Sequence, residues 1–392
     1  MHTYADPPVV FTRGRGSELF DADGRRYLDF VSGIAVTSLG HAHPEVAAAV
    51  ALQAQTLLHV SNLYGNELAP QVAATLDRLV GGGTPAGGQL FFCNSGAEAN
   101  ECALKLARRW AGRGRHTVIA TWGSFHGRTL ATLAATGQPE KHRPYEPLPS
   151  GFLHVPYDDL DAMADALDPS SVGAVIVEPI QGEGGVVVPS SDYLSGARAL
   201  CSERGVLLVC DEVQTGLGRT GEWFAFQRHH LRPDVVTMAK ALGNGMPVGA
   251  CWASAEVAAA FGPGDHATTF GGQPLAMAAV RATLAVMERE DVRSRAARSG
   301  ALLRAGLERL DGVAAVRGEG LLLAAQLPRA PEVAARALAL GLLVNPVRPD
   351  AVRLAPSLLV SDAEVEEALE LLGAALAGVQ APAADQPKAG GG

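Results

Sequence analysis

Short apolar runs alternate with helix-like stretches through the middle of the chain. The runs are rich in Val, Ile, Leu and Phe with little polar alternation, which is typical of strands buried on both faces. We expect helices over residues 97–111 and 192–204 between them. Strand–helix–strand alternation predicts an α/β fold with a mostly parallel sheet that is covered on both faces. The expected strands are residues 89–94, 117–122, 174–179, 206–212, 235–239 and 249–253.

The pattern changes near residue 275. Two helical stretches, 275–289 and 293–310, are followed by short strands and a final helix, which predicts a smaller α+β domain. A chain of 392 residues exceeds the size of one hydrophobic core, so we expect two domains. The remaining elements of the small domain are expected at residues 321–326, 342–345, 352–355 and 362–376.

The predicted domain boundaries follow from this change. Residues 1–50 would be an N-terminal segment that contributes to the small domain, and residues 51–274 would form the large α/β domain. Residues 275–378 would form the C-terminal small domain. The Ala/Pro/Gly-rich tail, residues 379–392, is predicted to be disordered.

Charge and composition exclude several classes of function. The net charge of −9 is spread along the chain without a basic stripe, which argues against nucleic-acid binding. No apolar run reaches the ~18–20 residues of a membrane span, and the first residues lack a secretory signal. Five cysteines show no CxxC spacing, and no Cys or His pair has metal-ligand spacing. We therefore expect a soluble, cytoplasmic protein without a metal or a membrane partner.

An acid and a lysine follow two of the predicted strands. Four apolar residues precede Asp211, where a buried carboxylate would need a cation or several donors. Lys240 follows the next strand, and burial would lower its pKa and free its amine to attack a carbonyl. The plainer readings are a loop acid and a lysine that extends to solvent. Ligands bind beyond the carboxyl ends of such strands, so we expect both side chains in one layer.

Lysine is scarce in this sequence. The chain has four lysines, and an arginine cannot serve as an amine nucleophile because it stays protonated. Three of them lie mid-helix, in a Pro-rich loop and in the tail, which leaves Lys240 as the candidate nucleophile. The four are Lys105, Lys141, Lys240 and Lys388.

Two further motifs suggest an anion site and a flat ligand. Ser95 and Glu98 are spaced as a capping box, and Gly96 would let an anion approach the start of the helix. Phe125 could stack on a ring and Arg128 could bind a carboxylate. Taken singly, these residues are more often a helix cap, a core aromatic and a surface charge.

Together these motifs resemble the class III (ornithine-type) aminotransferases, over about residues 20–371. The resemblance implies the type I fold of enzymes that use pyridoxal 5'-phosphate (PLP), with Lys240 holding the cofactor as a Schiff base. The motifs that carry it are residues 33–36 (Gly-Ile-Ala-Val), 40–44 (Gly-His-Ala-His-Pro), 61–64 (Ser-Asn-Leu-Tyr), 95–100 (Ser-Gly-Ala-Glu-Ala-Asn), 125–129 (Phe-His-Gly-Arg-Thr), 178–185 (Glu-Pro-Ile-Gln-Gly-Glu-Gly-Gly), 211–216 (Asp-Glu-Val-Gln-Thr-Gly), Lys240, 268–272 (Thr-Thr-Phe-Gly-Gly) and 353–356 (Arg-Leu-Ala-Pro).

The resemblance also implies which residues bind the cofactor. Ser95, Gly96 and Ala97 would hold its phosphate, with Thr269 reaching across from a partner subunit in a homodimer. The other cofactor residues would contact the ring, and Lys240 would move the proton between substrate and cofactor. By resemblance, Phe125 and Val213 cover the two faces, Asp211 keeps the ring nitrogen protonated, and Gln214 bonds near the phenolic oxygen.

Substrate binding is implied in the same way. Arg128 and Arg353 resemble the two carboxylate binders of the family, and Thr268 lies beside the substrate. Glu183 resembles a switch acid that pairs with Arg353 while the ω-amine substrate binds. It would release Arg353 to the α-carboxylate of glutamate.

The implied reaction is transfer of an amino group between N2-acetylornithine and 2-oxoglutarate. It would give N-acetylglutamate 5-semialdehyde and glutamate, within arginine biosynthesis. Three alternatives remain: another ω-aminotransferase (for ornithine, succinylornithine, succinyl-diaminopimelate or 4-aminobutyrate), an aminomutase of glutamate 1-semialdehyde, and a non-catalytic cofactor-binding protein. Thr37, Thr268 and Gln273 depart from the commoner family residues without removing a required chemical group.

Overall fold

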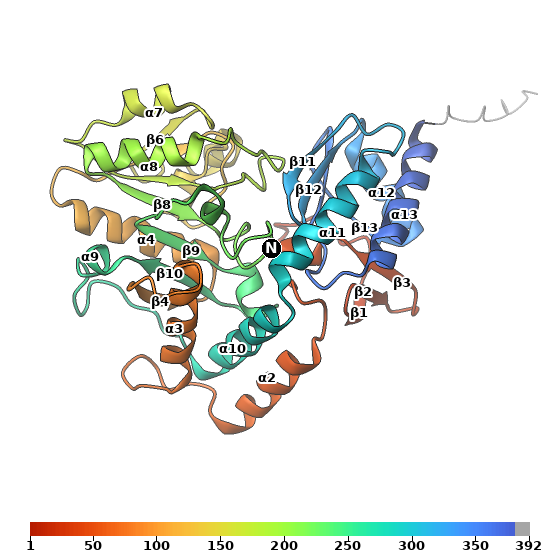
Figure 1. Ribbon diagram of the computed structural model, residues 1–392, viewed down its shortest axis with the longest axis horizontal. Helices are drawn as coiled ribbons and strands as arrows, with labels where there is room; N and C mark the ends of the chain where they lie inside the picture. Colours follow the sequence, from red (N-terminus) through yellow and green to blue (C-terminus); the bar gives the residue numbers. More distant parts are fainter. Residues whose placement is uncertain (381–392) are drawn as a thin grey trace, which may run out of the picture.

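A seven-stranded sheet forms the centre of the larger part of the molecule (Figure 1). The computed structural model describes residues 1–380. The strand order is β4-β10-β9-β8-β7-β5-β6, and only β10 runs antiparallel to its neighbours. The strands are β4 (Gln89–Cys93), β5 (Thr117–Thr121), β6 (Phe152–Val155), β7 (Val172–Val177), β8 (Leu207–Asp211), β9 (Val235–Met238) and β10 (Gly249–Ala253).

The mostly parallel α/β sheet predicted from the sequence is confirmed. All six predicted strands are present, each within two residues of its expected bounds. The missed strand, β6, has four residues and lies at the sheet edge, where Leu153 is exposed. A short edge strand does not produce the continuous apolar run that identifies a central strand.

Helices cover both faces of this sheet. Side chains of β7 and β8 alternate between two apolar clusters, one shared with α8 (Tyr193–Arg204) and the other with α4 (Gly96–Ala111). Both predicted helices are therefore confirmed within one residue. The other helices of this part are α1 (Ser32–Ala35), α2 (Pro44–Thr56), α3 (Leu68–Val80), α5 (Leu130–Ala135), α6 (Pro139–His142), η1 (Arg143–Tyr145), α7 (Leu160–Ala166), η2 (Ala225–His229), η3 (Lys240–Gly243), α9 (Ala255–Ala258) and α10 (Pro274–Arg289).

Two four-stranded sheets lie on the other side of the molecule (Figure 1). One is antiparallel, with the order β11-β12-β15-β14, and the other has the order β1-β2-β3-β13. Their strands are β1 (Phe11–Arg15), β2 (Glu18–Asp21), β3 (Arg26–Asp29), β11 (Ala315–Glu319), β12 (Leu322–Gln326), β13 (Leu342–Leu343), β14 (Asn345–Arg348) and β15 (Ala351–Leu354). The helices beside them are α11 (Val292–Leu307), α12 (Ala330–Leu340) and α13 (Asp362–Gln380).

The single strand predicted over residues 342–345 is wrong. β13 pairs with β3 of the N-terminal segment, whereas β14 pairs with β15 in the other sheet, so the chain changes sheets at Val344. The pairing of β13 with β3 brings the N-terminal segment and the C-terminal part of the chain into one sheet. The domain boundaries at residues 50, 274 and 378 stay predictions.

The last helix extends further than expected. α13 ends at Gln380, so the first two residues of the predicted disordered tail, 379 and 380, are helical. The rest of that predicted tail, residues 381–392, lies outside the described residues.

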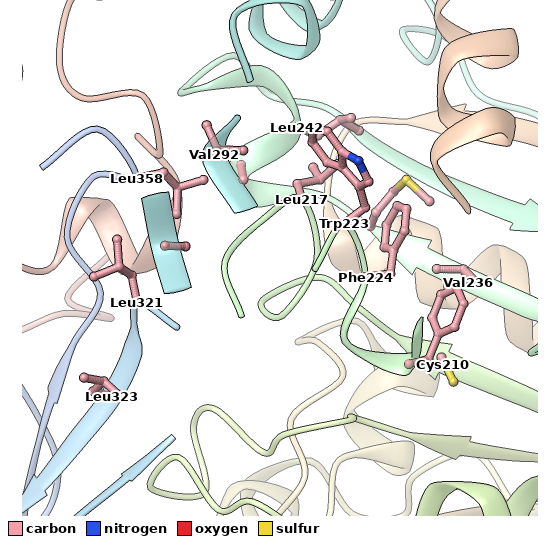
Figure 2. Close-up of a cluster of buried hydrophobic side chains, with 14 of the residues drawn as sticks. Cys210, Leu217, Trp223, Phe224, Val236, Leu242, Val292, Leu321, Leu323 and Leu358 are labelled. Atoms are coloured by element: carbon pink, nitrogen blue, oxygen red, sulfur yellow. The ribbon is translucent and has the colours of Figure 1, made fainter. Parts of the chain in front are cut away.

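One apolar cluster joins the central sheet to the smaller ones (Figure 2). It runs from Cys210 and Val236 of the central sheet to Leu323 of β12. Trp223, Leu217, Leu242, Val292, Leu321 and Leu358 lie between those ends in Figure 2. The central sheet and the smaller sheets therefore share one continuous hydrophobic core.

A buried arginine crosses the same junction. Arg219 is 1% exposed, and its Nη1 donates to the carbonyl oxygens of Leu321 (3.1 Å) and Pro356 (2.6 Å). Its Nη2 donates to Ser38 Oγ at 2.9 Å. No carboxylate among residues 1–380 pairs with it, and burial lowers the pKa of Arg219 to about 9.

Residues 1–380 contain neither a membrane-spanning helix nor a metal-binding cluster. Within residues 1–380, no helix is both long and apolar enough to cross a bilayer. The same residues contain no cluster of three His, Cys, Asp or Glu side chains placed to hold a metal ion. All five cysteines are buried and none forms a disulfide.

Candidate active site

A cavity of about 390 Å³ opens at the carboxyl ends of the parallel strands. Ten of the residues predicted from the sequence line it, and they come from five strand ends or the loops beyond them. These ten are Ser95, Gly96, Ala97, Phe125, Arg128, Glu183, Asp211, Val213, Gln214 and Lys240.

Asp211 and Lys240 lie on neighbouring strand ends. β8 ends at Asp211, and β9, its parallel neighbour, ends two residues before Lys240. Both side chains line the same cavity. The expectation that Asp211 and Lys240 lie in one layer beyond the strand ends is therefore confirmed.

Hydrogen bonds hold the Asp211 carboxylate, which is 3% exposed. Its Oδ2 accepts from Asn100 Nδ2 and from His126 Nδ1, each at 2.7 Å. Its Oδ1 accepts from the Val213 amide at 3.1 Å. Thr237 in turn donates to Asn100 Oδ1 at 2.7 Å, which fixes the orientation of that amide. The carboxylate is therefore held rigidly at the cavity wall.

His126 has one bonded and one unbonded ring nitrogen. Nδ1 contacts Asp211, whereas Nε2 is buried and has no hydrogen-bond partner among the described residues. Among residues 1–380, the ring therefore contacts the carboxylate through one nitrogen and has no partner at the other.

Lys240 has an unusual backbone conformation. Its φ is +42°, in the left-handed region that residues other than glycine seldom adopt. Such strain is concentrated at functional sites, where the surrounding structure maintains it. Burial lowers the pKa of Lys240, and the nearby Arg353 lowers it further, against the opposing effect of Glu183 and Asp211. Both effects favour the uncharged amine that a nucleophile needs.

The start of α4 forms one end of the cavity. Gly96 has no side chain between the helix and Val213; a Cβ there would lie 2.8 Å from a methyl carbon of Val213. The close approach leaves the first amides of α4 facing the cavity, where an anion would bind.

The predicted capping box is only half formed. Ser95 Oγ accepts from the Glu98 amide at 3.2 Å, as the spacing predicts. The Glu98 carboxylate bonds to the Asn94 amide instead of the Ser95 amide, at 3.0 Å. Ser95 has an extended backbone, and the carboxylate reaches one residue further back.

Glu178 fastens the two loops that flank the cavity. It lies just after β7, and its carboxyl group accepts from the Phe125 amide at 2.8 Å and the Gly182 amide at 3.2 Å. Burial raises the pKa of Glu178 to about 7, with the nearby Asp211 adding to the effect and His126 opposing it. The backbone of Phe125 is thereby fixed beside the cavity, which the residue lines.

Arg353 is buried and bonded to three side chains. Nη1 contacts Glu183 Oε1 at 2.8 Å and Gln214 Oε1 at 3.0 Å, and Nη2 donates to Asn345 Oδ1 at 2.6 Å. Burial alone would raise the pKa of Glu183, but Arg353 outweighs it and the pKa lies below its usual value. The Glu183–Arg353 pair that the family resemblance implies is therefore present.

Arg128 lies at the other side of the cavity and is exposed. Its guanidinium carbon lies 5.5 Å from the ring centroid of Phe125, within the range of a cation–π contact. Within the described part of the chain it forms no salt bridge, so its charge is available to a ligand.

Thr268 and Thr269 do not line this cavity. They border a second hollow of about 740 Å³, together with Asn62, Phe92 and other residues. Thr268 Oγ1 accepts from Asn94 Nδ2 at 3.4 Å, and this asparagine does line the main cavity. One chain therefore does not bring the two threonines into its own site.

Sequence reasoning missed four residues of the site. Asn100, His126 and Glu178 lie within the motifs quoted above, but the spacing of a motif does not reveal which side chains contact Asp211 or the Phe125 amide. Asn345 lies outside those motifs and follows from the register of β14 on β15. No signal in a single sequence identifies that register.

Comparison with known proteins places the chain in a family. A family model described as aminotransferase class-III matches residues 1–376. The chain is 50% identical to the acetylornithine aminotransferase of Gloeobacter violaceus, covering 95% of this chain and 94% of that protein. It is 47% identical to the acetylornithine aminotransferase of Corynebacterium efficiens, covering 97% of this chain and 96% of that protein.

Solved structures agree with this assignment. The ornithine aminotransferase of Toxoplasma gondii superposes with a TM-score of 0.92 at 34% identity, covering 97% of this chain and 93% of that one. The acetylornithine aminotransferase of Elizabethkingia anophelis gives a TM-score of 0.85 at 31% identity, covering 96% of each chain. The predicted family and fold are thus confirmed, and the chain belongs to the class III aminotransferases.

Proposed function

We propose that this chain is a cytoplasmic, PLP-dependent enzyme of arginine biosynthesis that transfers an amino group between N2-acetylornithine and 2-oxoglutarate. The products would be N-acetylglutamate 5-semialdehyde and glutamate. The observation that carries the proposal is the placement of Lys240 and Asp211 in one cavity, on neighbouring strand ends. The relatives at 47–50% identity, all acetylornithine aminotransferases, favour this substrate over ornithine.

The cavity fits PLP in size and in the chemistry of its walls. Its volume of about 390 Å³ lies within the usual range of roughly 300–1,000 Å³ for small-molecule sites. The amides of Gly96 and Ala97, with Ser95, would hold the phosphate, while Phe125 and Val213 would cover the ring. When bound, PLP would supply an electron sink for the charge that develops on the substrate carbon.

Asp211 would keep the ring nitrogen protonated. Its carboxylate is fixed by Asn100 and His126, so it would face a ring cation without reorganising. Gln214 would bond near the phenolic oxygen of the ring while it contacts Arg353. The same glutamine would therefore link the cofactor pocket to the substrate pocket.

Lys240 would serve first as nucleophile and then as base. Its Nζ would hold the cofactor covalently, because burial lowers the pKa of Lys240 and favours the uncharged amine. The same Nζ lines the cavity and would accept the proton that leaves the substrate carbon. One amine would perform both tasks because a lowered pKa favours the form with a free lone pair.

The two arginines would bind the substrate carboxylates. The exposed Arg128 would take the α-carboxylate of N2-acetylornithine while Glu183 pairs with Arg353. When glutamate enters, Glu183 would move aside and Arg353 would take its α-carboxylate. Thr268 lies outside the cavity of its own chain, so in a dimer it would lie beside the substrate bound to the other chain.

We also propose that the enzyme is a homodimer. Several large apolar side chains near Thr269 are exposed on one chain, including Leu63 (85%), Tyr64 (74%) and Phe270 (63%). A surface of this kind is typical of a protein interface. In the dimer, Thr269 of one chain would reach the cofactor phosphate of the other.

The central test is the Lys240→Ala variant. We expect about a 10³-fold or greater loss of glutamate formation from N2-acetylornithine and 2-oxoglutarate, because nucleophile and base are removed together. Borohydride reduction of the PLP-loaded wild type should label the peptide that contains Lys240. Lys105→Ala, at an exposed site on α4, is the control and should retain activity. Label on Lys105, or full activity of Lys240→Ala, would refute the assignment.

A further inference from the structure

Asn345 is the residue directly across from Arg353. The two are Cα partners in the antiparallel pair β14–β15. Their side chains meet, with Asn345 Oδ1 accepting from Arg353 Nη2 at 2.6 Å. The two strands bring this pair together, whereas Glu183 and Gln214 approach Arg353 from loops beyond the central sheet.

The three partners of Arg353 differ in charge and in freedom to move. Glu183 is charged, its side chain is 33% exposed, and its neighbours on both sides are glycines. Gln214 and Asn345 are neutral; Gln214 is 7% exposed and Asn345 lies on a strand. If Glu183 leaves, Nη1 keeps Gln214 and Nη2 keeps Asn345. The guanidinium then stays in place with its charge no longer balanced by a carboxylate.

We propose that Asn345 is a positioning residue that fixes the Arg353 guanidinium for the α-carboxylate of the dicarboxylic substrate. The inference rests on the proposed function, because it assigns Asn345 to the glutamate half-reaction. A long arginine side chain loses considerable conformational freedom when it is ordered. A neutral acceptor that orders it in advance therefore strengthens binding of the carboxylate that arrives later.

The amide, rather than an acid, is what this role requires. An oxygen at position 345 must accept from Nη2 without adding a second negative charge. A carboxylate there would neutralise Arg353 permanently, since a residue paired within the sheet lacks the freedom of the part-exposed Glu183 side chain. The substrate carboxylate would then compete with a fixed charge as well as with Glu183. With a neutral Asn345, the charge of Arg353 is thus balanced or left unbalanced by the position of Glu183 alone.

The test uses the isosteric variant Asn345→Asp in the PLP-loaded protein. The probe is glutarate, a dicarboxylate that has neither an amino nor a keto group, and its dissociation constant is measured by calorimetry. We expect glutarate to bind about 10-fold or more weakly, the size of one charge-assisted contact. The kcat/KM for glutamate should fall by a similar factor, whereas that for N2-acetylornithine should stay within about 3-fold. Asn345→Ala should weaken glutarate less than Asn345→Asp does.

Gln71→Glu is the matched control. Gln71 is exposed on α3, and its Oε1 accepts from Arg281 Nη1 at 3.2 Å, so the change places the same charge beside an arginine that does not line the cavity. It should leave glutarate binding unchanged. Unchanged glutarate binding by Asn345→Asp, or an equal loss in both half-reactions, would overturn the role of Asn345. A wild-type enzyme that binds glutarate but does not use N2-acetylornithine would instead overturn the proposed substrate.

Discussion

Two consecutive acids at the end of β8, Asp211 and Glu212, have different surroundings and therefore different roles. Asp211 faces the cavity, whereas Glu212 is buried outside it, with 1% of its surface exposed. Glu212 accepts from the Phe226 amide at 2.9 Å and from the hydroxyl of Thr215. Burial nevertheless raises the pKa of Glu212 to about 7. Its proton is therefore bound more tightly in the folded chain than in the unfolded one.

This shift predicts a stability that depends on pH. A raised folded-state pKa means that the stabilisation is present below the unfolded value of 4.5 and is lost as the pH rises to about 7. In Glu212→Gln, the amide can bond to Thr215 and Phe226 without titrating. Its free energy of unfolding, relative to wild type, should increase by roughly 2–3 kcal/mol between pH 5 and pH 8. Denaturant unfolding at both pH values measures this, and equal differences at the two would contradict the buried, titrating acid.

At the scale of residues, sequence reasoning worked where a strand end determines position. Lys240 and Asp211 each lie at or beside a strand end, and both side chains line one cavity; Arg353, near Lys240, was indicated only by the family resemblance. Their chemical roles stay predictions. Asn100 and His126 could not be assigned in advance, because their contact with Asp211 depends on how α4 and the loop after β5 pack.

At the scale of elements, the segment after β7 holds its place through glycines. A Cβ on Gly182 would lie 1.9 Å from Gln214 Oε1, so only glycine allows Gln214 to approach Arg353. Further along, the Gly185 carbonyl accepts from Arg317 Nε at 2.6 Å. The segment is thus anchored on both sides of Glu183, while the Glu183 side chain itself is anchored only by Arg353 among the described residues.

Gly182→Ala should therefore displace Gln214. We expect the kcat/KM for glutamate to fall about 10-fold, because Arg353 loses a hydrogen bond worth roughly 1–2 kcal/mol. Gly262→Ala is the control, since the nearest atom to its added Cβ would be Asp265 Oδ2 at 3.8 Å. Separate measurement of the two half-reactions checks the prediction, and a variant with wild-type efficiency toward glutamate would contradict it.

Elements were predictable to different degrees. The buried central strands and the helices α4, α8 and α10 follow from apolar runs and helical spacing. The N-terminal strands did not, because β1 (Phe-Thr-Arg-Gly-Arg) is short, largely exposed and rich in arginine and glycine. The change of sheet at Val344 depends on pairing with a strand more than 300 residues away in sequence, which local patterns do not encode.

At the scale of the whole molecule, the site of one chain is incomplete under the proposed reaction. Thr269 borders the second hollow, surrounded by exposed apolar side chains, and the main cavity does not include it. If a second copy covers this surface, each chain would complete the phosphate site of the other. Assembly and cofactor affinity would then be linked by mass action.

Leu63→Glu combined with Phe270→Glu should separate the subunits. Two buried charges in an apolar interface are costly, so we expect a monomer by size-exclusion chromatography and roughly 10-fold weaker PLP binding. Leu340→Glu places the same charge on an exposed leucine of α12 and should leave both properties unchanged. A wild-type protein that is monomeric at micromolar concentration and still binds PLP tightly would contradict the proposed assembly.

The buried Arg219 has a consequence for how this family member tolerates mutation. Two of its three acceptors are main-chain oxygens, so replacing the side chain of Leu321 leaves that bond available. These hydrogen bonds are therefore more sensitive to substitution of Arg219 than to substitution of Leu321 or Pro356. The planar guanidinium carries five N–H donors, and here two of its nitrogens reach acceptors on three separate segments. Replacing the side chain of Leu321 or Pro356 would leave the main-chain acceptors in place, whereas replacing Arg219 would remove all three of these side-chain hydrogen bonds.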